Sequence, residues 1–221
     1  MTASGEGARS HGLLLAWVAL VGVTTLLAFA VRLLFDVPED FRYSYWTVLV
    51  GIVSSAITLA IVVRIARSGG LRKMLALRRP RSYRRAALLG LAVTLLPLAM
   101  IALVPFLDAG EQQGNGVDWD PDRAVPFALN AVILVIVSPV VEELTFRGVG
   151  FRLLERYGHG WAIALTALAF ALTHGPVGEL PVILVVGASL AYLRSRTHSV
   201  YPGIVVHALI NLSSGAGTLS A

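Results

Sequence analysis

The sequence contains no cysteine. This absence excludes disulfide bonds, thiolate zinc sites and cysteine nucleophiles, and it leaves the redox state of the compartment unreadable. Charge is also scarce, because 14% of the 221 residues are charged, whereas soluble domains usually carry about 25%. Together with 56% hydrophobic residues and a mean hydropathy of +0.75, this scarcity indicates a membrane protein.

Lysine is scarce as well, since Lys73 is the single lysine among 18 basic residues. The arginine bias fits a GC-rich bacterial genome, although codon supply explains it as well as chemistry does. The sequence pI of about 10.1 could suggest a nucleic-acid partner. The basic residues lie between apolar segments rather than on a basic face, so we predict membrane lipid as the surrounding partner and no nucleic acid.

Seven apolar segments are candidates for helices in the bilayer. They are residues 12–35, 44–66, 86–107, 125–155, 161–173, 181–194 and 200–213. The first three meet the roughly 20 residues that one crossing needs, whereas the last three are short. Ala28, Phe29 and Ala30 resemble a signal-peptide cleavage site, but the apolar run continues beyond them, so we expect an uncleaved helix.

This pattern predicts an all-α, polytopic transmembrane helical bundle with three parts. Residues 1–123 carry three transmembrane helices and a basic loop, residues 124–215 carry the helices with ionisable groups, and residues 216–221 form a tail. We expect the active site among the last four helices.

The charges between the segments predict an orientation. The loop after the second segment is basic, and the loops on either side of it in the chain are acidic; the basic loop holds Arg64, Arg67, Arg72, Lys73, Arg78, Arg79, Arg81, Arg84 and Arg85. By the positive-inside rule, this loop and the N-terminus are expected on the cytoplasmic side of a cell membrane. We interpret the loop as a topology signal on a solvated face, with lipid head-group binding as the alternative.

Several ionisable residues fall inside the later apolar segments, where each costs about 2.5–3.5 kcal/mol at a helix centre on insertion scales. Glu142, Glu143 and Arg147 follow an apolar run, His174 ends the fifth segment, and His207 lies in the seventh. Such residues need a partner or a purpose. Interhelical hydrogen bonding explains one histidine or one ion pair alone, but it seldom requires two carboxylates and two imidazoles together.

Helical geometry sorts these residues. Neighbours differ by about 100° around a helix, so Glu142 and Glu143 cannot both face one cavity. Glu143 and Arg147 are spaced i,i+4 and can form a buried ion pair. Glu142 then lacks a local partner, which is the setting of a general base. His207 and Asn211 share a helix face by the same i,i+4 spacing, and so do Phe170 and His174.

The motifs EExxxR (Glu142, Glu143, Arg147), FxxxH (Phe170, His174) and HxxxN (His207, Asn211) occur in that order. In this respect the chain resembles the CPBP family of intramembrane proteases, also called the CAAX-protease and bacteriocin-processing or Abi family, which includes the Rce1-type prenyl-protein endoprotease. The resemblance covers about residues 125–215 and implies about eight helices.

The resemblance implies a role for each motif residue. Glu142 would activate water with help from His207, His174 and Asn211 would stabilise the oxyanion, and Glu143 with Arg147 would support the site. The family is described both as metalloproteases and as glutamate-dependent enzymes. His174, His207 and Glu143 could therefore form a zinc set, although no HExxH motif is present, and a metal-free glutamate mechanism is the preferred reading.

The expected function is hydrolysis of peptide bonds in membrane-associated substrates. Two alternatives remain open: a non-catalytic bacteriocin-immunity or scaffold protein, and a small transporter that uses the carboxylates and imidazoles as a proton relay. One geometric difficulty also remains. His174 lies roughly 20 Å along its helix, so a tilt or a kink at Pro139 is expected to bring it to Glu142.

Overall fold

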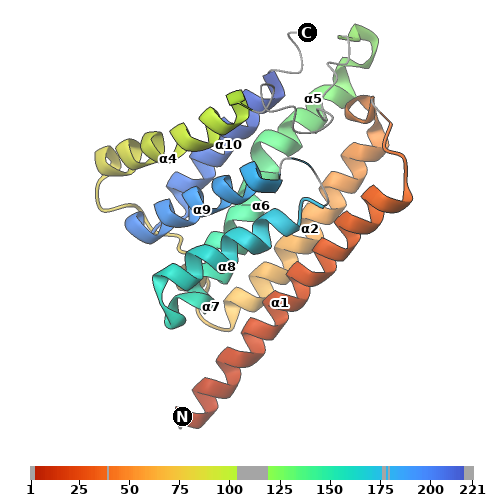
Figure 1. Ribbon diagram of the computed structural model, residues 1–221. Helices are drawn as coiled ribbons and strands as arrows, with labels where there is room; N and C mark the ends of the chain where they lie inside the picture. The colour runs from red at the N-terminus through yellow and green to blue at the C-terminus, as the bar shows by residue number, and fades with distance from the viewer. Residues whose placement is uncertain (1–2, 39, 104–118, 176–177, 179, 217–221) are drawn as a thin grey trace.

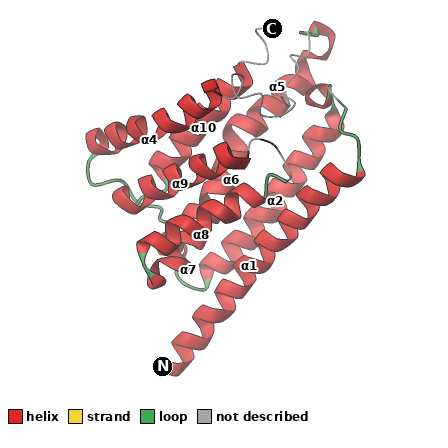
Figure 2. Cartoon of the chain, in the orientation of Figure 1, coloured by secondary structure: helices red, strands yellow, loops and turns green. Residues whose placement is uncertain are grey.

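The computed structural model describes residues 3–38, 40–103, 119–175, 178 and 180–216, and all regular structure within these ranges is helical. Figure 2 shows helices joined by short connections throughout the described chain. The predicted all-α architecture is therefore confirmed.

Four helices are long and apolar enough to cross a membrane among the described residues. Helix α1 (Ala3–Leu34), helix α2 (Tyr45–Arg67) and helix α4 (Tyr83–Leu103) supply three of them. The fourth is a continuous helical run, Pro121–Tyr157, that we call the central helix. These helices match the first four predicted segments, except that residues 104–107 of the third segment lie outside the described residues.

The central helix changes its hydrogen-bonding register several times. Its consecutive parts are η3 (Pro121–Arg123), α5 (Ala124–Val132), η4 (Ile133–Val137), α6 (Ser138–Glu142), η5 (Glu143–Gly150), α7 (Phe151–Leu154) and η6 (Glu155–Tyr157). Segments η4 and η5 are π-helical, a rare form that is frequently found at functional sites. Pro139 lies between them and lacks a backbone N–H, so the α-helical ladder cannot run uninterrupted there.

Three shorter helices complete the bundle: α8 (His159–Leu172), α9 (Leu180–Thr197) and α10 (Tyr201–Ala216). Helix α9 packs against α8 and α4, and α10 packs against α4, α9 and the central helix (Figure 1). Helices α8 and α10 are apolar but shorter than the crossing length, and α9 is not among the long apolar helices. Within the described residues, four helices have the length and composition of a membrane span. The seven to eight crossings expected from the sequence are therefore shown only in part.

A turn at Gly158 removes the geometric difficulty over His174. Gly158 has φ +112°, a backbone conformation that favours glycine, and it reverses the chain between the central helix and α8. Glu142 and His174 lie at equal distances along the chain on opposite sides of the Gly158 turn. Each is therefore roughly 20 Å from the turn, and the antiparallel hairpin brings them to the same depth. The tilt or kink at Pro139 expected from the sequence is not needed for this common depth, because that expectation measured only one arm of the hairpin.

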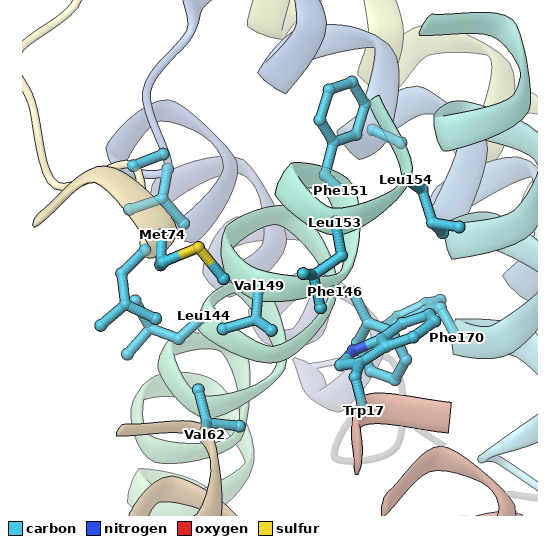
Figure 3. Close-up of a cluster of buried hydrophobic side chains, with 14 of the residues drawn as sticks. Trp17, Val62, Met74, Leu144, Phe146, Val149, Phe151, Leu153, Leu154 and Phe170 are labelled. Atoms are coloured by element: carbon cyan, nitrogen blue, oxygen red, sulfur yellow. The ribbon is translucent and has the colours of Figure 1, made fainter. Parts of the chain in front are cut away.

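An aromatic cluster joins α1 to the central helix and α8. The Trp17 ring meets Phe146 edge-on at 6.5 Å, and Phe146 meets Phe170 at 5.4 Å (Figure 3). The indole N–H of Trp17 donates to the backbone carbonyl of Thr145 at 3.0 Å. This packing requires a glycine at position 150, because a Cβ there would lie 2.5 Å from Cζ2 of Trp17.

Charge is distributed unevenly between the two ends of the central helix. At its start, Arg123 pairs with Asp40 and with Asp120. The hydrogen bond from Arg123 lowers the pKa of the Asp120 carboxyl. At its far end, arginines of the basic segment, α7 and α9 gather around one cavity. The positive-inside rule relates such an asymmetry to the orientation of a membrane protein.

We predict that Gly150→Ala destabilises the protein, because the new methyl group overlaps the Trp17 ring. Overpacking of this kind costs about 1–3 kcal/mol, which outweighs the gain of up to about 1 kcal/mol from replacing a helical glycine by alanine. The measurement is the thermal unfolding midpoint of the detergent-solubilised protein.

Gly22→Ala in α1 is the matched control, because nothing lies within 4 Å of a Cβ at that position. It is expected to leave the unfolding midpoint unchanged or to raise it. Equal effects of the two substitutions would contradict the packing described for Trp17.

Candidate active site

A fully buried ion pair lies in segment η5. Arg147 Nη1 is 3.0 Å from Glu143 Oε1, and both side chains have 0% exposure. Arg147 also donates from Nη2 to the carbonyl of Gly187 at 2.9 Å, and its guanidinium lies 4.5 Å from the centroid of the Phe170 ring. The ion pair predicted from the i,i+4 spacing is therefore present, and it ties the central helix to α8 and α9.

Helix α10 approaches this pair closely enough to require glycine. A Cβ at Gly203 would lie 2.4 Å from Oε2 of Glu143. The same helix carries His207 one turn later, and Nδ1 of His207 lies 3.4 Å from Oε1 of Glu143. The same carboxylate oxygen, Oε1 of Glu143, therefore lies close to both a guanidinium and an imidazole.

His207 also reaches the neighbouring carboxylate. Its Nε2 is 3.6 Å from Oε2 of Glu142, a distance for charge interaction that is too long for a direct hydrogen bond. The imidazole is 4% exposed, whereas the Glu142 side chain is 30% exposed. Glu142 and Glu143 thus have different surroundings, as the 100° argument predicted: one is sealed in the protein and the other is accessible.

Glu142 faces a cavity of about 230 Å³ between α1, α2, the central helix and the end of α8. Most of its polar lining is hydroxyl; the lining residues are Leu20, Val21, Thr24, Ser54, Ser55, Thr58, Ser138, Val141, Glu142, Thr145, Phe146, Thr173 and His174. A polar cavity of this size can hold several waters. Sequence reasoning placed the site among the last four helices and missed the part of the lining from α1 and α2. Their serines and threonines inside apolar segments were the available signal.

The cavity lies near the middle of the long apolar helices. Residues 20–24, 54–58 and 138–146 contribute to it. Each range lies close to the midpoint of its span: Ser10–Leu34, Tyr45–Arg67 and Pro121–Tyr157. The cavity is therefore lined by the middle parts of helices that are long and apolar enough to cross a membrane.

His174 shares this cavity, and its hydrogen bond selects a tautomer. Nδ1 lies 2.8 Å from the backbone carbonyl of Phe170. A carbonyl only accepts, so Nδ1 carries the proton, and in the neutral ring Nε2 is an acceptor. His174 can donate a second hydrogen bond only as the imidazolium.

Phe170 links the two histidines. Its ring centroid lies 4.7 Å from that of His174 and 5.5 Å from that of His207. Phe170 is 1% exposed, so its ring is fixed by the surrounding packing. The sequence marked Phe170 only as the partner of His174 in a motif, whereas in the fold it orients both imidazoles.

Asn211 has a different setting. Its Nδ2 donates to the backbone carbonyl of Leu134 at 2.9 Å, and Asn211 does not line the cavity of Glu142 within the part of the chain that is described. The α-helical donor to this carbonyl would be the N–H of Ser138, but that group donates to Ile133 instead. The next backbone nitrogen belongs to Pro139 and has no hydrogen. Asn211 therefore supplies the hydrogen bond that the proline removes, which matters in hydrocarbon because an unpaired carbonyl is costly there.

The zinc set considered from the sequence is not assembled. Across the described residues, no three histidine, aspartate or glutamate side chains lie close enough to hold a metal ion. His207 lies between Glu142 and Glu143, while the Nδ1 of His174 is engaged with its own helix. The geometry of His174, His207 and Glu143 does not fit a metal site, so the metalloprotease alternative is not supported.

Comparison with known proteins points to a peptidase family. Residues 124–213 match the family described as "Type II CAAX prenyl endopeptidase Rce1-like". A 102-residue stretch is 26% identical to the Bacillus subtilis (strain 168) protein named "Putative membrane peptidase YdiL". The match covers 46% of this chain and 41% of that relative. No solved structure matches the chain.

We predict that Asn211→Ala destabilises the protein by about 1–3 kcal/mol, because it leaves the Leu134 carbonyl without a donor. Pro139→Ala restores a backbone N–H next to that carbonyl. In the Pro139→Ala background the cost of Asn211→Ala is expected to fall by at least about half, and the difference is the coupling free energy of a double-mutant cycle. Unfolding free energies of the four proteins provide the measurement.

Asn211→Asp is the control for side-chain shape, because aspartate has nearly the same size but its carboxylate cannot donate. It is expected to lose the same stabilisation as Asn211→Ala. Additive effects of the Asn211 and Pro139 substitutions would contradict the assigned hydrogen bond.

Proposed function

From the match of residues 124–213 to the Rce1-like family of type II CAAX prenyl endopeptidases, we propose that this chain is an intramembrane endopeptidase. It hydrolyses a peptide bond of a membrane-associated substrate in the cavity that Glu142 faces. The observation that carries the proposal is the pairing of one accessible carboxylate with His207 at 3.6 Å, beside a polar cavity at mid-depth.

In the proposed reaction, Glu142 acts as general base on a water molecule in the cavity. Its carboxylate accepts a proton as the water oxygen attacks the carbonyl carbon of the scissile bond. The carbon–nitrogen bond then breaks, and the proton held by Glu142 passes to the leaving amine. His207, at 3.6 Å, stabilises the Glu142 charge before the proton is taken. The Glu143 and Arg147 pair holds the helix and His207 in place.

The oxyanion needs donors, and the hydrogen bonds described for the site constrain which groups supply them. His174 donates to the oxyanion as an imidazolium, because its Nδ1 proton is already given to Phe170. The resemblance also implied Asn211 in this role. Its bond to the Leu134 carbonyl favours a positioning role instead, in which Asn211 stabilises the break in the central helix before Glu142.

The proposal includes an arrangement in the membrane. The four long apolar helices cross the bilayer, and α8, α9 and α10 are embedded among them, so that the chain has seven membrane-embedded segments. The basic end of the bundle faces the cytoplasm by the positive-inside rule. The family description makes prenylated peptides with a C-terminal CAAX sequence the first substrates to test.

We predict that Glu142→Gln lowers the rate of peptide cleavage at least about a hundredfold, because it removes the general base. It is expected to leave the free energy of unfolding nearly unchanged. The Glu142 side chain is partly exposed, and its contact with His207 at 3.6 Å is too long for a hydrogen bond. The assay follows cleavage of membrane-anchored reporter peptides, prenylated and unprenylated, by the purified protein in vesicles.

Glu143→Gln is the matched neighbour with the opposite expectation. It leaves Arg147 buried without its counter-charge, which costs about 3–5 kcal/mol of stability. If Glu142→Gln retained cleavage, the peptidase proposal would fail. If the native chain cleaved no reporter but supported proton flux that Glu142→Gln abolished, the transporter alternative would replace it. A phenotype that persists in Glu142→Gln cells would favour the immunity or scaffold role.

A further inference from the structure

The basic loop identified in the sequence is called the basic segment from here on. Its part after α2 is folded against the core rather than extended into solvent. Its middle residues Met74, Leu75 and Ala76 are at most 5% exposed. The carbonyl of Ala76 accepts the N–H of Val200 at 3.3 Å, and Leu75 lies so close to the central helix that a Cβ on Gly148 would be 3.2 Å from its Cα. The backbone that carries the arginines and the lysine of this segment is therefore fixed against the core, which the expectation of a solvated topology signal did not include.

These positions surround a cavity of about 1120 Å³ at the basic end of the bundle. Six of its lining side chains are cationic and one is a carboxylate; they are Arg72, Lys73, Arg78, Arg152, Arg156 and Arg194, with Glu155. The volume is that of a ligand site rather than of a packing defect. A concentration of positive charge around one concave space attracts anions strongly.

Arg194 is the buried member of this set. It is 3% exposed, its Nε donates to the carbonyl of Arg147 at 3.0 Å, and its guanidinium lies 5.1 Å from the centroid of the Phe151 ring. Among the described residues its Nη1 has no hydrogen-bond partner. A buried charged donor without a hydrogen-bond acceptor costs free energy. An acceptor bound in the cavity would therefore stabilise the Arg194 side chain.

The polar residues around the cavity bond to other arginines and do not accept a hydrogen bond from Nη1 of Arg194. Glu155 pairs with Arg152. Arg156 donates to Ser10 and to the Tyr157 hydroxyl, both of which are neutral. Glu155 is the single carboxylate of the lining among the side chains that the structure describes, so most of the six cations have no counter-charge from these residues.

His198 also lines this cavity, and the direction of its pKa shift reflects the positive charge around it. Burial lowers the pKa of this imidazole, and the neighbouring guanidiniums of Arg78 and Arg194 lower it further. The Nε of Arg78 also donates to the carbonyl of His198 at 2.5 Å. The histidine therefore adds no positive charge near neutral pH, and the field that it experiences is positive.

We propose that this cavity is a binding site for a phosphate-bearing anion. Guanidinium and ammonium groups are the side chains that bind phosphate oxygens, and Arg194 can offer Nη1 from the cavity wall while Arg72 and Lys73 close over the anion. Ser10 and Leu13, at the start of the apolar span Ser10–Leu34, and Ser68 and Gly69, just after α2, also line the cavity. The cavity therefore lies at the ends of two candidate membrane spans, where lipid head groups are expected. The phosphate can belong to an anionic phospholipid or to a soluble phosphate compound. The site is separate from the cavity of Glu142, and the proposal does not depend on peptidase activity.

The test is direct binding to the detergent-solubilised full chain. Short-chain phosphatidylglycerol and sn-glycerol 3-phosphate are titrated separately, and short-chain phosphatidylcholine serves as the neutral-headgroup lipid. Arg194→Gln is expected to raise the dissociation constant about tenfold or more, as expected for loss of a hydrogen bond to a charged group. The double variant Arg72→Gln, Lys73→Gln changes only exposed side chains, so it keeps the test valid if Arg194→Gln does not fold.

Arg84→Gln is the matched control, because it removes one positive charge from the same basic segment without lining the cavity. Its dissociation constants are expected to equal those of the native chain. Binding of phosphatidylglycerol that glycerol phosphate cannot reproduce identifies a lipid ligand, and equal binding of both identifies a soluble one. The proposal is overturned if neither probe binds, if phosphatidylcholine binds equally well, or if the Arg72 and Lys73 variant binds like the native chain.

Discussion

The buried ion pair between Glu143 and Arg147 is the constraint on which the site depends. Two charges in a region of low dielectric are tolerated when each compensates the other. Arg147 also donates to the Gly187 carbonyl and lies over the Phe170 ring, and these contacts fix α9 and α8 against the central helix. Glu143 lies 3.4 Å from His207, a contact that brings in α10. These contacts hold the central helix, α8, α9 and α10 together around the candidate active site.

Once Glu143 is sealed in the core, Glu142 has to point elsewhere. Its neighbour's orientation turns it toward the polar cavity, where α1 and α2 contribute hydroxyl groups and α8 contributes His174. The same imidazole of His207 contacts both carboxylates, one buried and one accessible. A structural pair and a reactive carboxylate are thus adjacent in the chain and share one histidine, but they differ in access to water.

Backbone hydrogen bonding imposes a second constraint in the membrane. Pro139 interrupts the central helix just before Glu142, and the π-helical segments on either side change the direction in which side chains leave the helix. Such a break is stable in hydrocarbon only if the freed carbonyl finds another donor. Asn211 supplies it for Leu134 from α10. Helix α10 therefore contacts the central helix at two places. His207 lies beside Glu143, and Asn211 donates to the Leu134 carbonyl.

The sequence alone determined the helical class, the approximate positions of the first four apolar helices and the pairing of Glu143 with Arg147, because length, hydropathy and i,i+4 spacing are local properties. It also singled out His174 and His207, since an imidazole inside an apolar segment is visible without any fold. Only the tertiary structure decided that Glu142 and His174 lie at one depth, because this depends on a hairpin at Gly158 and not on either helix alone. The contribution of α1 and α2 to the cavity, the contact of Asn211 with Leu134 and the gathering of arginines around Arg194 are contacts between residues distant in the chain. No local pattern encodes them, because packing of whole helices sets which faces meet.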